Sequence, residues 1–320
     1  MKLRILIPVC LCLPALLLAQ EPAQPEVLAL KAARLFDGKA DAVVRNAVVI
    51  VEGGKIKAAG SGLEIPAGAR VVDLGDSTLL PGFIDSHTHV TNQLEDDWNA
   101  ALVAGLRRTI PEETLRASIF ARAMLMAGFT TIRDLGSGEW IDAAVRNAAR
   151  DGSIQGPRML VAAHSLGARG GHCDESGFPY KRFGEEPGIK EGIASGADQF
   201  RDAVRFQIKY GADVIKVCAT GGVLSLSDEV DTPQLTQEEM DAIVDETHRL
   251  RKKAAAHAHG AEGAKVAIRA GIDSIEHGSF LDDEALRMMK QKGTYLVPTL
   301  LAGEFVTAPE RKLPPEIAAK

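Results

Sequence analysis

Two histidines placed two residues apart are the side chains of this sequence best suited to chemistry. His87 and His89 end the segment PGFIDSHTH, residues 81–89, whose apolar start is typical of a β-strand. Because side chains alternate between the two faces of a strand, both imidazoles project to the same side, together with Asp85. Two imidazoles on one strand end can bind a cation such as Zn²⁺. A pair of exposed loop histidines has the same spacing, so the metal interpretation requires further ligands elsewhere.

Further metal-competent side chains lie at the ends of later strand-like segments. They are His164, Lys216, the pair His257 and His259, and His277. Of the eight histidines, only His248 falls on an expected helix, where we interpret it as a solvated surface residue. In a barrel of parallel strands the carboxyl ends meet at one face, so these side chains are expected to converge there.

Lys216 is unusual because apolar neighbours surround it in the segment VIKV, residues 214–217. A buried ammonium is costly unless it is paired or neutralised, so one interpretation is a salt bridge to a carboxylate. The alternative is that desolvation lowers the pKa of the amine, which then reacts with CO₂ to form a carbamate. A carbamate is an anionic oxygen ligand that can bridge two cations.

The segments that carry these residues alternate between strand-like and helical patterns. Apolar strand-like runs occupy residues 82–89, 130–135, 158–164, 213–219, 254–259, 273–277 and 294–300. Helical spacing occupies residues 111–127, 139–150, 199–210, 236–253, 260–270 and 281–292. This alternation predicts an α/β protein with a (β/α)₈ TIM-type barrel, and a doubly wound open sheet is the alternative. An eighth strand on the same repeat would begin beyond Lys320, so we expect the barrel to be incomplete at its C-terminus.

Three regions are predicted along the chain. Residues 1–19 have the positive start and apolar core of a secretory signal peptide, which predicts a periplasmic or secreted protein without a stable membrane anchor. Residues 26–78 contain short alternating segments with a Gly53-Gly54 hairpin, and we interpret them as a small antiparallel, β-sandwich-like domain. Residues 79–320 form the barrel.

Composition narrows the classes of partner. The 320 residues are 46% hydrophobic and 25% charged, with a formal net charge of −6, so nucleic acid is not an expected partner. A small-molecule substrate and a homo-oligomer are compatible with this balance. Beyond the signal segment only Cys173 and Cys218 remain, and we expect Cys218 to be a buried free thiol.

Five motifs in order give the chain a resemblance to a known family. They are PGFIDSHTH, GFTTIRD, GADVIK, AAHAHG and GIDSIEHG, at residues 81–89, 128–134, 211–216, 255–260 and 271–278. The chain resembles the metal-dependent amidohydrolase superfamily, in its imidazolonepropionase-like branch that includes Xaa-Pro and Xaa-Arg dipeptidases. The resemblance implies two divalent ions, expected to be Zn²⁺: His87 and His89 bind one, His257 and His277 bind the other, and a Lys216 carbamate bridges them.

The same resemblance implies hydrolysis of a C–N amide bond in a dipeptide or an N-acyl amino acid by a metal-activated hydroxide. His172 is expected to reach the carbonyl oxygen, with His164 as a weaker candidate, and His259 to contact substrate. Arg133 and Asp134 are interpreted as an ion pair at the barrel mouth. Alternatives are a cyclic-amide hydrolase, a deaminase or a non-catalytic barrel.

One departure from the family affects the expected activity. The family places a proton-accepting aspartate on the eighth strand, and this sequence has no aspartate after Asp283. We therefore expect that the sequence is a C-terminally incomplete version of a longer protein. A protein of only these 320 residues is expected to fold poorly and to lack turnover, because a seven-stranded barrel leaves two sheet edges unpaired.

Overall fold

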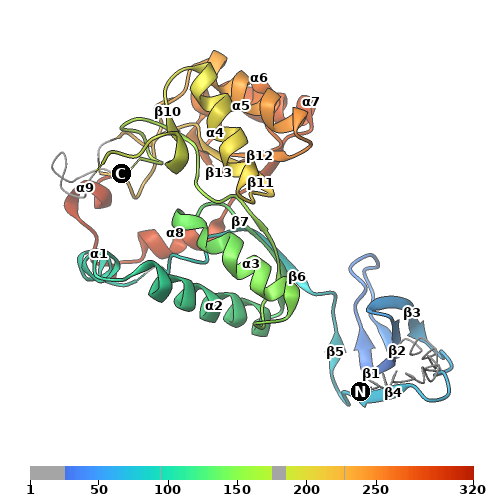
Figure 1. Cartoon of the computed structure of the whole chain (residues 1–320). Helices are drawn as coiled ribbons and strands as arrows, with labels where there is room; N and C mark the ends of the chain where they lie inside the picture. The colour runs from blue at the N-terminus through green and yellow to red at the C-terminus, as the bar shows by residue number, and fades with distance from the viewer. Residues whose placement is uncertain (1–25, 94, 175–184, 227) are drawn as a thin grey trace, which may run out of the picture. The chain divides into compact units, whose positions relative to one another are not determined.

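The computed structural model describes residues 26–93, 95–174, 185–226 and 228–320, and the chain divides into two compact units between Pro81 and Gly82 (Figure 1). The expected signal peptide lies outside these residues. Within the described chain, no helix combines the length and apolar character needed to cross a membrane.

The first unit is one mixed sheet. Its strands are β1 (Val27–Leu35), β2 (Val44–Glu52), β3 (Lys55–Ser61), β4 (Arg70–Asp73) and β5 (Thr78–Leu79). The order is β3-β2-β1-β4, and β5 also pairs with β1. The expected antiparallel, sandwich-like arrangement is wrong because β4 and β5 return to β1 in the parallel direction. The hairpin is confirmed: Glu52 pairs with Lys55 across Gly53 and Gly54, whose φ angles of 57° and 74° suit the turn.

The second unit contains the seven expected parallel strands. They are β6 (Phe83–Thr88), β7 (Phe129–Asp134), β8 (Arg158–Val161), β11 (Val214–Cys218), β12 (Lys253–Gly260), β13 (Ser274–Phe280) and β14 (Tyr295–Val297). Their pairings form a β6-β7-β8 sheet and a β11-β12-β13-β14 sheet, and a parallel bridge between Leu166 and Val217 links the two. This sequential parallel order is that of a β/α barrel. Among the described residues, β6 and β14 each have a strand neighbour on one side only.

Helices follow most of these strands. They are α1 (Trp98–Leu106), α2 (Ile110–Met126), α3 (Ile141–Asp151), α4 (Ala197–Lys209), α5 (Gln237–Arg249), α6 (Ala261–Ala270), α7 (Asp283–Lys292), α8 (Leu300–Thr307) and α9 (Pro315–Ala318). Short elements also occur, namely the 3₁₀ turns η1 (Gly138–Trp140) and η2 (Ile189–Glu191) and the strand pair β9 (Gly167–Ala168) and β10 (Ile193–Ala194). The sequence patterns did not predict α1 and α8. Helix α5 begins with a capping box, in which Thr236 and Glu239 each bond to the other's backbone.

Three expected elements end earlier than their patterns suggest. Residues with positive φ lie just beyond the observed ends: Ala163 after β8, Arg251 after α5 and Thr299 after β14. A left-handed residue reverses the local chain direction and stops regular pairing, and hydrophobicity alone does not show where this happens. The strand expected at residues 294–300 therefore stops at Val297, and α8 begins at Leu300.

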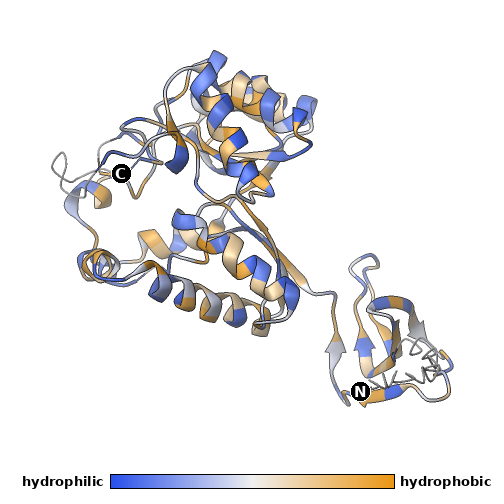
Figure 2. Ribbon diagram, in the orientation of Figure 1, coloured by the Kyte–Doolittle hydropathy of each residue, from blue (hydrophilic) through white to orange (hydrophobic). Residues whose placement is uncertain are grey.

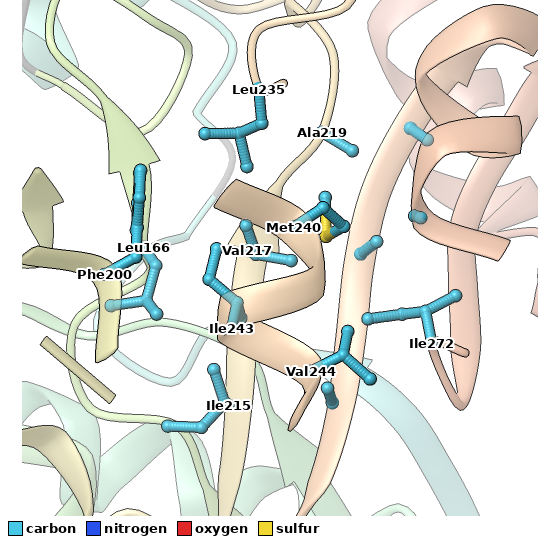
Figure 3. Close-up of a cluster of buried hydrophobic side chains, with 14 of the residues drawn as sticks. Leu166, Phe200, Ile215, Val217, Ala219, Leu235, Met240, Ile243, Val244 and Ile272 are labelled. Carbon is cyan, nitrogen blue, oxygen red and sulfur yellow. The ribbon is translucent and has the colours of Figure 1, made fainter. Parts of the chain in front are cut away.

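The strands of the second sheet are buried on both faces, as parallel strands usually are. Ile215 and Val217 of β11 face the helices, where they pack with Phe200 of α4 and with Met240 and Ile243 of α5 (Figure 3). On the other face, Val214 joins a separate buried cluster with Leu135, Ala162 and Ala255. Hydrophilic and apolar residues alternate along the covering helices (Figure 2), so each helix has an apolar side for the sheet. Lys216 projects from this same face of β11, two residues after Val214.

A buried carboxyl at the start of α3 predicts a specific pH dependence of stability. Asp142 is fully buried and accepts hydrogen bonds from the backbone N–H groups of Ala143 at 2.6 Å and Ala163 at 2.9 Å. Burial raises the pKa of Asp142 to about 6, above its value in an unfolded chain. The native state therefore keeps this proton up to a higher pH than the unfolded chain does. As the pH rises from 4 to 6, the free energy of unfolding should fall by up to about 3 kcal/mol.

We expect Asp142→Asn to remove this pH-dependent change in the free energy of unfolding, because the amide does not ionise. Urea unfolding of the parent and the variant at about pH 4.5 and pH 7 measures the difference. Equal pH dependence in the two proteins would contradict the assignment.

Candidate metal and catalytic site

The strand ends bring the expected imidazoles into one cluster. His87 lies in β6 and His89 directly after it, His257 and His259 lie in β12, and His277 lies in β13. Their ring centroids lie 5.3 Å apart for His87 and His89, 4.9 Å for His87 and His277, 4.6 Å for His257 and His277, and 4.9 Å for His259 and His277. Parallel strands in register place residues of distant sequence position at the same end, which explains this convergence.

His277 reaches the cluster through an unusual backbone conformation. On β13 its neighbours Ile275 and Glu276 are both fully buried, Ile275 in the core shared with the helices. Simple alternation would turn His277 to the same side as Ile275. The φ angle of His277 is 72°, a left-handed value that is uncommon for a residue with a Cβ. This departure from regular strand geometry allows the ring to lie in the cluster.

Hydrogen bonds to acceptor-only oxygens fix which nitrogen each ring leaves free. His89 donates from Nδ1 to the carbonyl of Gly136 at 2.9 Å, and His257 donates from Nε2 to the carbonyl of Gly221 at 3.1 Å. The remaining nitrogens, Nε2 of His89 and Nδ1 of His257, therefore carry lone pairs. Burial lowers the pKa of both rings, so they are neutral. Neutral imidazoles oriented by such donations are the form that binds metal ions.

The donor set fits a divalent cation. His257, His259 and His277 each offer one nitrogen, and the three nitrogens lie within 4.8 Å of one another. Three imidazoles are a common zinc ligand set. His257 was the expected ligand and His259 the expected substrate contact, and both lie in this group. His259 also bonds Ser279 Oγ at 2.8 Å through Nδ1.

Lys216 lies beside the imidazoles without a salt-bridge partner. It is 3% exposed and takes part in no ion pair among residues 26–93, 95–174, 185–226 and 228–320. Burial lowers the pKa of its amine to about 8, although the charge of Glu276 acts in the opposite direction. The expected alternative of a direct salt bridge is therefore absent from the described chain.

Lys265 shows how this protein otherwise buries an amine. Its side chain is 5% exposed, and its Nζ lies 2.9, 2.8 and 2.7 Å from carboxylate oxygens of Glu262, Asp282 and Glu284. These hydrogen bonds raise the pKa of Lys265. The contrast marks the environment of Lys216 as one that favours the neutral amine.

Glu276 is a site residue that the sequence analysis did not assign a role. Its Oε2 accepts a hydrogen bond from His87 Nδ1 at 2.8 Å, and its Oε1 accepts from Arg133 Nη2 at 2.8 Å and from Ser274 Oγ at 2.6 Å. Burial lowers the pKa of His87, and its Nε2 is left free. A carboxylate in a strand, one residue before a histidine, was the available clue.

Arg133 and Asp134 do not form the expected ion pair. Arg133 pairs with Glu276, whereas Asp134 Oδ2 accepts the backbone N–H of Val90 at 2.6 Å. Adjacent residues of β7 point to opposite faces, which separates the two side chains. Arg133 is thus a structural ion-pair residue with a different partner.

The two loop histidines expected near the site differ in position. His172 packs against His257 with ring centroids 4.2 Å apart, and burial lowers its pKa to about 4. His164 instead packs on Trp140 at 4.9 Å and accepts the backbone N–H of Glu139 at 3.2 Å. The structure therefore places His172, and not His164, in contact with the cluster.

Cys218 is disulfide-bonded to Cys173, with the two Cα atoms 5.9 Å apart. The expectation of a buried free thiol is wrong, because the loop after β9 returns over the end of β11. Cys173 follows His172 directly, so the bond fastens the His172 loop two residues beyond Lys216. Sequence spacing could not show this contact, since 45 residues separate the cysteines.

Comparison with known proteins gives consistent matches. The model of the amidohydrolase family matches residues 78–319. Ochratoxinase of Aspergillus niger is 34% identical over 272 residues, covering 80% of this chain and 55% of that protein, so the chain spans about half of that relative's length. Imidazolonepropionase of Paraburkholderia phymatum is 28% identical, covering 85% of this chain and 68% of that protein. The crystal structure of a Xaa-Pro dipeptidase with bound methionine matches with a TM-score of 0.85 and 35% identity over 92% of this chain and 72% of that one.

The bond from His87 to Glu276 predicts an effect on zinc binding. Glu276→Gln replaces the charged acceptor, so His87 becomes a weaker base, and zinc affinity should fall by about 10- to 100-fold. Competition with a chromophoric chelator measures the dissociation constant. The matched control is Glu238→Gln on the exposed surface of α5, which should bind zinc like the parent. Unchanged affinity in Glu276→Gln would show that the carboxylate does not support His87 as a ligand.

Proposed function

Because the chain belongs to the amidohydrolase family, we propose that it is a binuclear metal-dependent hydrolase of C–N amide bonds, acting on a dipeptide or an N-acyl amino acid. The observation that carries this proposal is the cluster of neutral imidazoles around Lys216 at the carboxyl ends of neighbouring strands. The similarity to the crystal structure of a Xaa-Pro dipeptidase supports the substrate class.

We assign the metal ligands by donor chemistry. His87 and His89 would hold one ion, and His257 and His277 the other, with zinc as the expected metal. When bound, the ions lower the pKa of water to about 7 and polarise the scissile carbonyl. His259, which lies in the same group of nitrogens, would contact substrate or serve as a ligand. The chain's own contribution is to keep these nitrogens unprotonated and fixed in orientation.

Lys216 would complete the site as a carbamate. The neutral amine nitrogen forms a bond to the carbon of CO₂, one proton leaves to solvent, and the product carries a single negative charge. Two features favour this reaction: the amine is buried, and it lacks the carboxylate partners that hold Lys265 as an ammonium. The anion would supply counter-charge to a cluster that otherwise consists of neutral rings.

A second candidate function is hydrolysis of a cyclic amide, which the imidazolonepropionase relative favours. Both reactions attack a carbonyl bonded to nitrogen, so the described side chains serve either. Deamination is a further alternative, and a mononuclear site without a carbamate would favour it. A barrel that retains the side chains without turnover is the non-catalytic alternative.

We further propose that the protein is exported to the periplasm or beyond the cell. The disulfide between Cys173 and Cys218 supports this location, because disulfides persist mainly in oxidising compartments. Mass spectrometry after thiol alkylation of protein taken from producing cells tests the proposal. Both cysteines should resist alkylation until a dithiol reduces them, and alkylation without reduction would contradict it.

Replacement of Lys216 tests the carbamate. Protein equilibrated with ¹³CO₂ should show a carbamate carbon resonance and bind about two zinc ions, measured by mass spectrometry of the metal. Lys216→Ala should lose the resonance and bind less zinc, and short carboxylic acids should restore part of the zinc content. Lys265→Arg, a conservative change at the paired buried lysine, should leave both readouts unchanged. Retention of two zinc ions without Lys216 would overturn the bridging role.

Ligand binding to the zinc-loaded protein distinguishes the substrate classes. The zinc-loaded protein should be stabilised against heat by members of a dipeptide library in a concentration-dependent manner. Cyclic amides and nucleosides should stabilise it less. Stabilisation by cyclic amides alone would contradict a dipeptide substrate and support the second candidate function.

A further inference from the structure

The ring of His172 occupies a space that exists because residue 222 is a glycine. A Cβ on Gly222 would overlap the Nδ1, Cε1 and Nε2 atoms of this ring. The φ angle of Gly222 is not left-handed, so close approach, and not backbone conformation, is what excludes a side chain here. The Gly222 position therefore acts as a socket for an imidazole from another loop.

Ser225 contacts the Nδ1 edge of that ring. Its Oγ lies 3.0 Å from His172 Nδ1, 2.5 Å from Asp228 Oδ1 and 3.1 Å from the carbonyl of Gly222. Ser225 is 9% exposed, and the Asp228 side chain is 7% exposed. The three polar groups thus meet in a space with little access to water.

The hydroxyl has one proton and three neighbours, which determines the direction of each bond. The Asp228 carboxylate and the Gly222 carbonyl can only accept hydrogen bonds. The carboxylate oxygen is the closer, at 2.5 Å from Ser225 Oγ, and without a proton between them these two oxygens would repel each other. The Ser225 hydroxyl therefore donates its proton to one of these two acceptors. Burial alone would raise the pKa of Asp228, but hydrogen bonds from Ser225, Lys320 and Gln234 lower it, which keeps the group ionised. Ser225 therefore has only lone pairs to offer His172.

It follows that His172 donates from Nδ1 and carries its lone pair on Nε2. In the described chain, no hydrogen bond involves this Nε2 atom. The sequence-based expectation was that His172 stabilises a carbonyl oxygen, which requires a donor. The hydrogen-bond network instead leaves Nε2 of the neutral ring as a hydrogen-bond acceptor.

We propose that Ser225 and Asp228 are positioning residues that hold His172 as its Nδ1–H tautomer, so that Nε2 accepts a hydrogen bond from an N–H or O–H group of the bound substrate. This inference rests on the proposed function for the identity of the substrate, but the tautomer itself does not. A free amino group of a dipeptide is a donor of this class, whereas the acylated nitrogen and carboxylate of an N-acyl amino acid offer fewer donors.

The His172 loop is fastened independently of the ring. The backbone N–H of His172 donates to Gln234 Oε1 at 2.9 Å, and the neighbouring Cys173 is bonded to Cys218. Removal of the Ser225 hydroxyl should therefore change the proton position on the imidazole without releasing the loop. This separation makes the proposal testable by a conservative substitution.

The first test is the tautomer, measured by two-bond ¹H–¹⁵N correlation spectra of histidine-labelled full-chain protein without substrate. The His172 resonances are assigned by their loss in His172→Asn. The parent should show a protonated Nδ1 and an unprotonated Nε2. Ser225→Ala should give a mixture of tautomers, Ser225→Thr should restore the parent pattern, and Ser195→Ala, on the exposed turn before α4, should leave it unchanged. A parent spectrum with the proton on Nε2 would overturn the proposal.

The second test is binding to the zinc-loaded protein, measured by calorimetry with a reduced-amide dipeptide analogue. Ser225→Ala should weaken binding by about twofold or more with unchanged zinc content, because half or more of the rings present the wrong nitrogen. N-acetylation of the analogue should weaken binding to the parent, and have less effect in the variant. Equal binding by parent and Ser225→Ala, or an Nε2 resonance that shifts on zinc addition as a metal ligand does, would overturn the substrate role.

The two proposals fail in different ways. If the parent tautomer is as expected but no dipeptide analogue binds, the proposed substrate class is wrong and the positioning of His172 stands. If the analogue binds but the tautomer is reversed, the positioning inference is wrong and the proposed function stands.

Discussion

The structure depends on burying many nitrogen bases in one place without placing matching carboxylates around them. Five imidazoles and the Lys216 amine meet at the strand ends, and Glu276 is engaged by His87 and Arg133. Burial makes protonation unfavourable, so each base must stay neutral or receive counter-charge from outside the chain. The carbonyls of Gly136 and Gly221 accept hydrogen bonds from the N–H groups of His89 and His257. A site arranged in this way has lone pairs directed at a common space, which is the condition for binding cations.

The barrel supplies this condition through two kinds of segment. Strands β6 and β12 hold imidazole nitrogens at fixed heights, because regular pairing sets each residue relative to its neighbour. Loops after β9 and β11 hold His172, because a glycine socket, a disulfide and the Gln234 side chain act together. Periodicity therefore places the imidazoles of β6 and β12, a left-handed backbone places His277, and tertiary contacts place the loop histidine.

This division explains what the sequence could predict. The seven strands, the Gly53-Gly54 hairpin and the convergence of His87 and His257 follow from period-two alternation and parallel order. The roles of Glu276 and Cys218 could not be predicted, since their partners lie on other strands or loops. Element ends were missed where a single left-handed residue such as Ala163 stops a strand, because apolar composition continues past it.

His277 shows how the two levels of control combine. Its sequence position next to Glu276 would direct the two side chains to opposite faces of β13, yet both lie at the site. The left-handed backbone at His277 allows this, at a cost of order 1 to 3 kcal/mol that the surrounding contacts must offset. One of those contacts is the bond between His277 Nδ1 and Thr299 Oγ1 at 2.7 Å, and Thr299 is itself left-handed. Backbone strain is thus concentrated where two adjacent residues must serve one site, which is where a regular strand cannot deliver both side chains.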